Sequence, residues 1–320
     1  MIWKRRESIL PRWKFSSIQK SFKQKLMNKN IKLLLKHWLP PIIHEKLYGY
    51  RAWLKFLMYE KKGVLNKNSV LENTGKGKRA FLIATGPSIK MDDLNALAGE
   101  DCYGISNFFL HEHIQSINPK FHFFVPYHEP VILESYVKWL VEADKLLPSE
   151  TNIFMGHSTY DLVNKYNLFK KRDIFYLYLG GYPAGDRVDI TKPVLAPQTG
   201  PLMALPVLLY MGYKEIYLVG CDHTEMRDYK KTVNNFYDPS KDIRETTPDI
   251  KNVWYEGIIN NLCNTANTFK QYIFYRKILR NRDVRIINLS QDSWLDLFEM
   301  DTLKNVLDKV EQKSFDKTLS

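Results

Sequence analysis

Three short loops carry residues suited to binding a charged or sugar-like ligand. The first is Thr85-Gly86-Pro87-Ser88, which follows a short apolar run. Gly86 lets the backbone approach a phosphate or sugar closely, and Ser88 offers a hydroxyl and an amide. The loop matches neither a Walker loop nor the three-glycine dinucleotide fingerprint. A Gly-Pro-Ser turn is often only a turn, but its place after the first core strand favours ligand binding.

The second loop, residues 197–201, contains Gln198, Thr199 and Gly200 and precedes an apolar helix expected at 202–211. A Thr-Gly step at a helix N-terminus can hold an anion or a hydroxyl. The alternative is that Thr199 only caps the helix.

The third loop places Asp222 and His223 directly after a strand expected at 215–220. A carboxylate beside an imidazole suits proton transfer or ligand orientation. Adjacent residues on an extended chain point in opposite directions, so only one of the two needs to face a ligand. A histidine at such a rim can also be purely structural.

Further polar residues follow two other expected strands. Asn107 ends the second strand, and His128 and Glu129 follow the third. Side-chain amides there suit bases or ribose hydroxyls, and His128 or Glu129 can act as acid or base. The run 111–113, His-Glu-His, is expected to be structural, because residues i and i+2 do not share a helix face.

Strands and helices alternate along the chain from residue 79. We expect strands at 80–85, 103–108, 121–125, 153–155, 174–179, 215–220 and 284–289, and helices near 92–97 and at 131–147, 202–211, 254–279 and 303–310. Such alternation predicts an α/β, Rossmann-like domain with a mostly parallel sheet and helices on both faces.

The charge is divided unevenly. Residues 1–79 carry a balance of +16 and the remainder −4, which together give the net charge of +12. We therefore expect a basic helical arm at 1–60, a polar linker at 61–78 and a catalytic domain at 79–320. A basic appendage on a slightly acidic body fits an anionic surface better than a nucleic acid, so no nucleic-acid partner is expected.

The arm has apolar residues at helical spacing among lysines and arginines, for example Leu47, Tyr50 and Leu54. This pattern suits an anionic membrane surface, although the same stripe can instead pack on the body. Three scattered cysteines indicate a reducing compartment. With no apolar run long enough to span a bilayer and no signal peptide, we expect a cytoplasmic protein, peripheral at most at the inner membrane face.

Several of these segments resemble the family-42 bacterial sialyltransferases and the related MptE-like domain, whose archaeal members are 6-hydroxymethylpterin diphosphokinases. They are Phe81-Leu-Ile-Ala-Thr-Gly-Pro-Ser88, Ser106-Asn107, Gln198-Thr199-Gly200 and Met211-Gly-Tyr-Lys-Glu-Ile-Tyr-Leu-Val-Gly-Cys-Asp222. The resemblance covers roughly residues 79–289. It implies a GT-A-like variant of the Rossmann fold that uses a CMP-activated sugar without an obligatory metal.

The resemblance also implies roles for individual residues. Gly86, Ser88 and Asn107 would contact the nucleotide. Thr199 and Gly200 would lie near the sugar carboxylate or the phosphate. Asp222 would lie at the rim of the cytidine or the donor.

The chain departs from the family pattern in two ways. Thr224 stands where a tyrosine is expected to help the departing phosphate, and Tyr229 or Tyr237 can take the place of a second tyrosine. The histidine base expected further along is absent, because His223 is the last histidine of the chain. The candidates for the base are then His223, His128 and Glu256, in that order.

Three hypotheses follow. The first is a glycosyltransferase that moves a CMP-linked sugar to a glycan or glycolipid acceptor in surface-polysaccharide synthesis. The second is a pterin diphosphokinase, which needs ATP and Mg²⁺, with Asp222, Asp92 and Asp93 as candidate metal ligands. The third is a non-catalytic scaffold that binds nucleotide sugars.

Overall fold

The computed structural model describes residues 41–180, 188–228, 235–247, 258–280 and 282–309. The chain divides into two units, Met1–Lys55 and Phe56–Ser320. Helix α2 (Pro41–Leu57) starts in the first unit, and the earlier part of the expected arm, 1–40, lies outside the described residues. Within the described residues, no helix is both long enough and apolar enough to span a bilayer.

The larger unit is built on a sheet whose described strands all pair in parallel, in the order β5-β4-β3-β2-β1-β6-β7-β8. This arrangement confirms the α/β fold with a mostly parallel sheet. The strands are β1 (Arg79–Ile83), β2 (Cys102–Ile105), β3 (Phe121–Phe124), β4 (Asn152–Gly156), β5 (Ile174–Leu177), β6 (Glu215–Val219), β7 (Arg285–Asn288) and β8 (Glu299–Met300).

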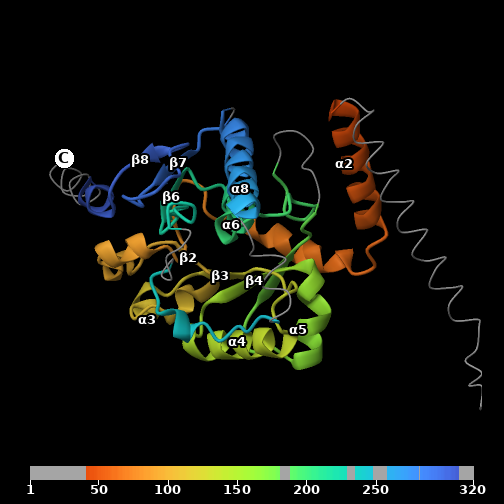
Figure 1. Ribbon diagram of the computed structural model, residues 1–320, viewed down its shortest axis with the longest axis horizontal. Helices are drawn as coiled ribbons and strands as arrows, with labels where there is room; N and C mark the ends of the chain where they lie inside the picture. The colour runs from red at the N-terminus through yellow and green to blue at the C-terminus, as the bar shows by residue number, and fades with distance from the viewer. Residues whose placement is uncertain (1–40, 181–187, 229–234, 248–257, 281, 310–320) are drawn as a thin grey trace, which may run out of the picture. The chain divides into compact units, whose positions relative to one another are not determined.

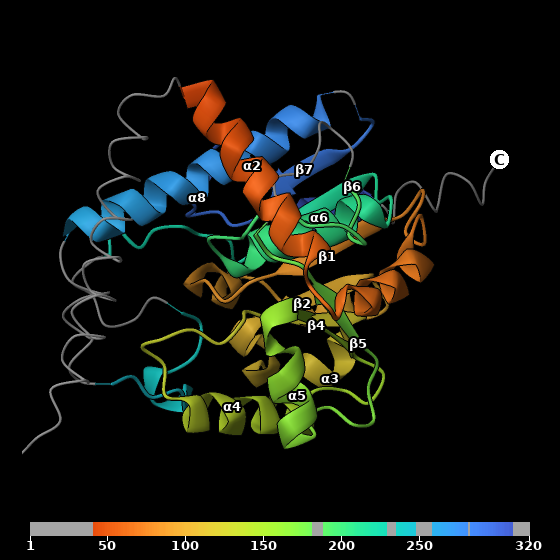
Figure 2. The ribbon, with the colours of Figure 1, turned by 90° about the vertical axis from the view of Figure 1, so that its right-hand side faces the viewer.

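Helices cover both faces of the sheet because alternate strand residues point to opposite sides. In β1, Phe81 and Ile83 enter one core cluster, and Ala80 and Leu82 enter the other. The first cluster includes residues of α3 (Ile114–Ile117), α4 (Leu133–Leu146) and α5 (Tyr160–Tyr166). The second includes residues of α6 (Gly200–Tyr210) and α8 (Ile258–Leu279). Figures 1 and 2 show the two helix layers on opposite sides of the strands.

The winding of the sheet reverses between β1 and β6. From β1 the chain adds β2 to β5 in order on one side, and after β5 it returns through α6 to place β6 on the other side of β1. In doubly wound sheets, ligands bind at such a switch point, outside the carboxyl ends of the strands.

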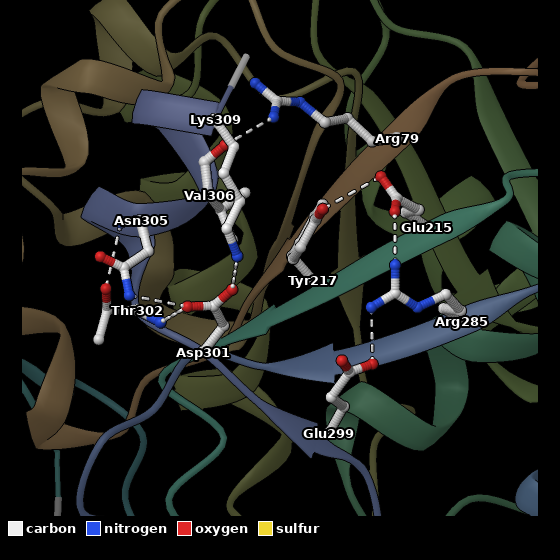
Figure 3. Close-up of polar contacts among 10 residues, drawn as sticks. All are labelled: Arg79, Glu215, Tyr217, Arg285, Glu299, Asp301, Thr302, Asn305, Val306 and Lys309. Carbon is white, nitrogen blue, oxygen red and sulfur yellow. Dashed lines mark hydrogen bonds and ion pairs between the residues drawn. The ribbon is translucent and has the colours of Figure 1, made fainter. Parts of the chain in front are cut away.

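The amino ends of the outer strands are joined by ion pairs. Arg285 at the start of β7 binds Glu215 of β6 at 3.2 Å and Glu299 of β8 at 2.7 Å. Figure 3 shows this guanidinium between the two carboxylates, with the Tyr217 hydroxyl donating to Glu215. In the same view the Arg79 side chain donates to the carbonyl of Val306, in the helix at 303–309. These contacts tie the strands together at the edge opposite the switch point.

Two segments differ from the sequence-based expectation. The helix expected near 92–97 is two short 3₁₀ turns, Pro87–Met91 and Leu94–Leu97, the second capped by the side chain of Asp93. The stretch 61–78, expected as a linker, contains a 3₁₀ segment, Lys62–Leu71, with buried side chains. Asn68 is fully buried there and donates to the carbonyls of Tyr176 and Ile190, both at 2.8 Å. Packing against the sheet therefore orders a stretch whose composition suggested a loop.

Candidate functional site

A cavity of about 210 Å³ opens at the switch point. Its walls come from residues 84–87 after β1, 105–106 at the end of β2, 199–201 at the start of α6 and 220–225 after β6. Gly86, Pro87, Thr199, Gly200, Asp222 and His223 all line it. The structure thus brings together the three loops singled out from the sequence.

The first and third loops interlock through Gly86. Its backbone N–H donates to the carbonyl of Gly220 at 2.9 Å. A Cβ at position 86 would lie 2.5 Å from that carbonyl oxygen and 2.6 Å from Cγ of Asp222. Such contacts are too short for any side chain, so glycine is required here for the close approach of two chain segments.

Ser88 and Asp222 form the polar part of this contact. The Asp222 carboxylate accepts a hydrogen bond from the Ser88 backbone N–H at 2.9 Å and another from the Ser88 hydroxyl. Burial raises the pKa of Asp222, and the two hydrogen bonds from Ser88 oppose that rise. Asp222 is 5% exposed, and Ser88 lies behind the cavity wall.

Helix α6 begins at the cavity with Gly200, followed by Pro201 in its first turn. The first N–H groups of a helix have no intrahelical acceptor and favour a negative charge. A Cβ at position 200 would clash with Cγ2 of Ile105, so this helix start also requires glycine. Thr199 makes no capping hydrogen bond from its side chain. Gln198 lies outside the wall, and its backbone N–H donates to the Gln271 side chain of α8 at 3.0 Å.

His223 lines the cavity, and its imidazole ring is hydrogen-bonded to Tyr272, which lies outside the cavity wall. His223 adopts a left-handed backbone conformation with φ of 51°. Its Nε2 lies 2.9 Å from the hydroxyl of Tyr272 in α8, and its Nδ1 lies 3.8 Å from Glu225. Burial lowers the pKa of His223 to about 4. The imidazole is therefore neutral at physiological pH, with a lone pair on one of its two ring nitrogens.

Asn107 does not line the cavity. The strand ends at Ile105, and Asn107 lies in a 3₁₀ turn, fully buried. Its side-chain carbonyl accepts from Trp139 Nε1, and its amide donates to Asp242 at 3.0 Å. Ser106 lines the cavity instead, with φ of 52°, and its carbonyl lies 2.7 Å from Nε2 of the buried His122.

The remaining candidates lie elsewhere. His128 is exposed, lies outside the cavity wall and contacts the carbonyl of Glu129 through Nδ1. Tyr229 and Glu256 lie outside the described residues. Tyr237 is 7% exposed. Asp92 and Asp93, proposed with Asp222 as metal ligands, do not line the cavity.

Several residues of the site were missed from the sequence. Glu225 and Asn235 line the cavity. Tyr272 backs His223 from a helix distant in sequence. Glu225 carries a weak sequence signal, because it closes the same polar loop as Asp222. Tyr272 carries none, because its helical spacing reads as an ordinary core position.

A second cavity, of about 650 Å³, lies at the amino ends of the strands and is rich in charge. Most of its charged groups are already paired, as in Arg79 with Glu100 at 2.5 Å and Lys214 with Asp283 at 2.6 Å. Mutually neutralised side chains leave little for a charged ligand, so the cavity at the switch point is the better candidate.

No family model matches the chain, and no curated protein matches it. Among solved structures, it is similar to the sialyltransferase CstII from Campylobacter jejuni in complex with cytidine-5'-monophosphate, at 17% identity and a TM-score of 0.41 over 70% of this chain and 85% of the other. CstII with a trisaccharide acceptor and CMP gives the same values. An α-2,3-sialyltransferase from Campylobacter jejuni in apo form is 18% identical, with a TM-score of 0.33 over 71% and 82% of the two chains.

Proposed function

We propose that the chain is a glycosyltransferase that uses a CMP-activated sugar, and that the cavity at the switch point binds the donor. One observation carries the proposal. The separate segments that resemble the family-42 sialyltransferases, ending in Ser88, Gly200 and Asp222, lie around a single cavity although they are far apart in sequence. A chance set of turns has no reason to converge at the carboxyl ends of β1 and β6.

The donor's negative charge is bound mainly by backbone groups. No Lys or Arg is among the described residues that line the cavity. At the N-terminus of α6 the backbone N–H of Gly200 can donate to a phosphate or carboxylate, whereas the next residue, Pro201, has no N–H. Whole-ligand pockets usually measure about 300–1,000 Å³. The cavity, at about 210 Å³, therefore holds part of the donor, and the rest extends beyond it.

The reaction is a displacement with inversion. A hydroxyl of a glycan or glycolipid acceptor attacks the anomeric carbon, a new C–O bond forms, and the bond to the phosphate of CMP breaks with its electron pair. The acceptor's proton passes to His223. CMP leaves as the anion.

His223 suits the role of base through its Nδ1. Tyr272 lies at Nε2, and if its hydroxyl accepts the Nε2 proton, Nδ1 is left with a free lone pair. Glu225, 3.8 Å from Nδ1, then stabilises the imidazolium that forms. The tyrosine hydroxyl then holds Nε2 in a hydrogen bond, and the carboxylate offsets the charge.

A nucleotide panel tests the donor class. CMP, CDP, UDP and ATP are compared by thermal shift, each with and without Mg²⁺. A ligand at about 100 times its Kd stabilises the folded state by about 2.7 kcal/mol, so CMP should raise the midpoint by several degrees without metal. Stabilisation by ATP only with Mg²⁺ would instead support the diphosphokinase.

Hydrolysis of a CMP-sugar then separates enzyme from scaffold. The expected result is slow release of CMP by the wild type, strongly reduced in His223→Ala and unchanged in His128→Ala. Binding of CMP-sugar with no turnover in the presence of candidate acceptors would favour a non-catalytic scaffold.

A further inference from the structure

Helix α2 has an apolar side that is exposed. Leu47, Tyr50, Leu54 and Leu57 recur at helical spacing and are 45%, 61%, 37% and 45% exposed, and Met58 just after the helix is 72% exposed. We call these five residues the outer stripe. Ala52 and Phe56, one turn apart on the other side, are 7% and 6% exposed. The helix is therefore apolar on both sides, which its own packing does not require.

Positive charge borders the outer stripe. Arg51 and Lys55 are exposed, and no ion pair among the described residues involves them. The outer stripe thus has two exposed cations beside it on the same helix.

We propose that the outer stripe docks on an anionic phospholipid surface, with α2 lying in the plane of the interface. Its apolar side chains would enter the acyl boundary while Arg51 and Lys55 meet the headgroups. A second copy of the chain is a poorer occupant, because it would place two regions of +16 charge against each other. This inference is independent of the reaction at the cavity.

A fluorescent probe tests which surface meets the lipid. Cys102 and Cys221 are buried and Cys263 is exposed on α8. An environment-sensitive dye is placed at Met58→Cys in a Cys263→Ser background, and in a second sample at the native Cys263. Cys263 is a matched control, because it lies beside Ile259 and Leu262, exposed apolar residues of α8 that are not part of the outer stripe.

Vesicles of phosphatidylcholine with phosphatidylglycerol are compared with phosphatidylcholine alone. We expect a blue shift of the dye at position 58 with the anionic vesicles only, and none at position 263. A shift at 263 without one at 58, or a shift at 58 that depends on protein concentration without lipid, would overturn the proposal.

Sedimentation with the same vesicles tests the side chains in the full chain. Leu54→Gln with Met58→Gln should lower the partition coefficient at least tenfold, and Arg51→Gln with Lys55→Gln should do so at low salt but much less at high salt. Ile259→Gln with Leu262→Gln on α8 should leave it unchanged. All three pairs are exposed, so an unchanged thermal midpoint shows that folding is intact. Undiminished sedimentation of both α2 pairs would assign lipid binding to another segment and refute the docking surface.

Discussion

The Asp222 carboxylate accepts hydrogen bonds from both the backbone N–H and the hydroxyl of Ser88. Asp222 follows β6 and Ser88 follows β1. The two residues thus follow the two strands that flank the reversal of the sheet. The pair therefore closes one wall of the candidate site, and its chemistry can be separated into hydrogen bonding and charge.

Asp222→Ala removes the buried carboxylate that accepts both hydrogen bonds from Ser88. We expect a loss of about 2–3 kcal/mol in the free energy of unfolding, because unsatisfied buried donors are costly. Asp222→Asn can still accept from the Ser88 N–H and donate to its hydroxyl oxygen, so its loss should stay below about 1 kcal/mol. Urea unfolding measures both. Equal losses would show that the charge, and not the hydrogen bonding, stabilises the wall.

Gly86→Ala introduces a Cβ against the Gly220 carbonyl and the Asp222 carboxyl group. Overpacking should cost about 1–3 kcal/mol, and the shifted wall should abolish the thermal shift caused by CMP. Gly63→Ala is the control, because its Cβ would have no neighbour within 4 Å. A Gly86→Ala variant that binds CMP normally would remove this loop from the site.

Tyr272→Phe removes the hydroxyl at Nε2 of His223 and keeps the buried ring. Because the His223 ring loses the hydrogen bond that orients it, we expect kcat for sugar transfer to fall about tenfold while KM stays nearly constant. Tyr275→Phe, a buried position in the same helix, is the control and should leave kcat unchanged. Steady-state kinetics with a CMP-sugar measure both. A change in KM alone would place Tyr272 in donor binding.

His122 and His223 predict a loss of stability in acid. Burial lowers the pKa of each to about 4, so the unfolded chain takes up these protons first as the pH falls from about 6.5. Stability should therefore decline between pH 6.5 and 4, by up to about 3 kcal/mol for each histidine. His122→Gln keeps an amide donor for the Ser106 carbonyl but does not titrate. In urea unfolding measured at several pH values, this variant should show about half of the decline. If stability falls with pH as steeply as in the wild type, His122 is not one of its sources.

Asn68→Ala tests whether the segment before β1 is part of the folded body. The change leaves the carbonyls of Tyr176 and Ile190 without their side-chain donor. We expect a loss of about 2 kcal/mol by urea unfolding. Asn66→Ala, at an exposed position of the same segment, should stay within about 0.5 kcal/mol. A loss below about 0.5 kcal/mol in Asn68→Ala as well would mean that the segment contributes little to stability.

The strands of the sheet could be predicted because short apolar runs between polar turns are typical of strands buried on both faces. The three loops could be placed at one edge, since parallel strands end together. The sequence could not show that Ser106, and not Asn107, lines the cavity. That outcome depends on β2 ending at Ile105 and on a left-handed turn at Ser106, whose carbonyl contacts His122. Tyr272 was equally hidden, because only tertiary packing brings it to His223.

The reversal between β1 and β6 leaves the candidate cavity away from both ends of the sheet. The outer strands are β5 on one side and β8 on the other, and neither contributes to the cavity wall. Additional strands or insertions beside β5 or β8 would therefore leave the strands and loops of the cavity wall unchanged. The periphery of such a sheet can change while the loops that form the candidate site keep their places.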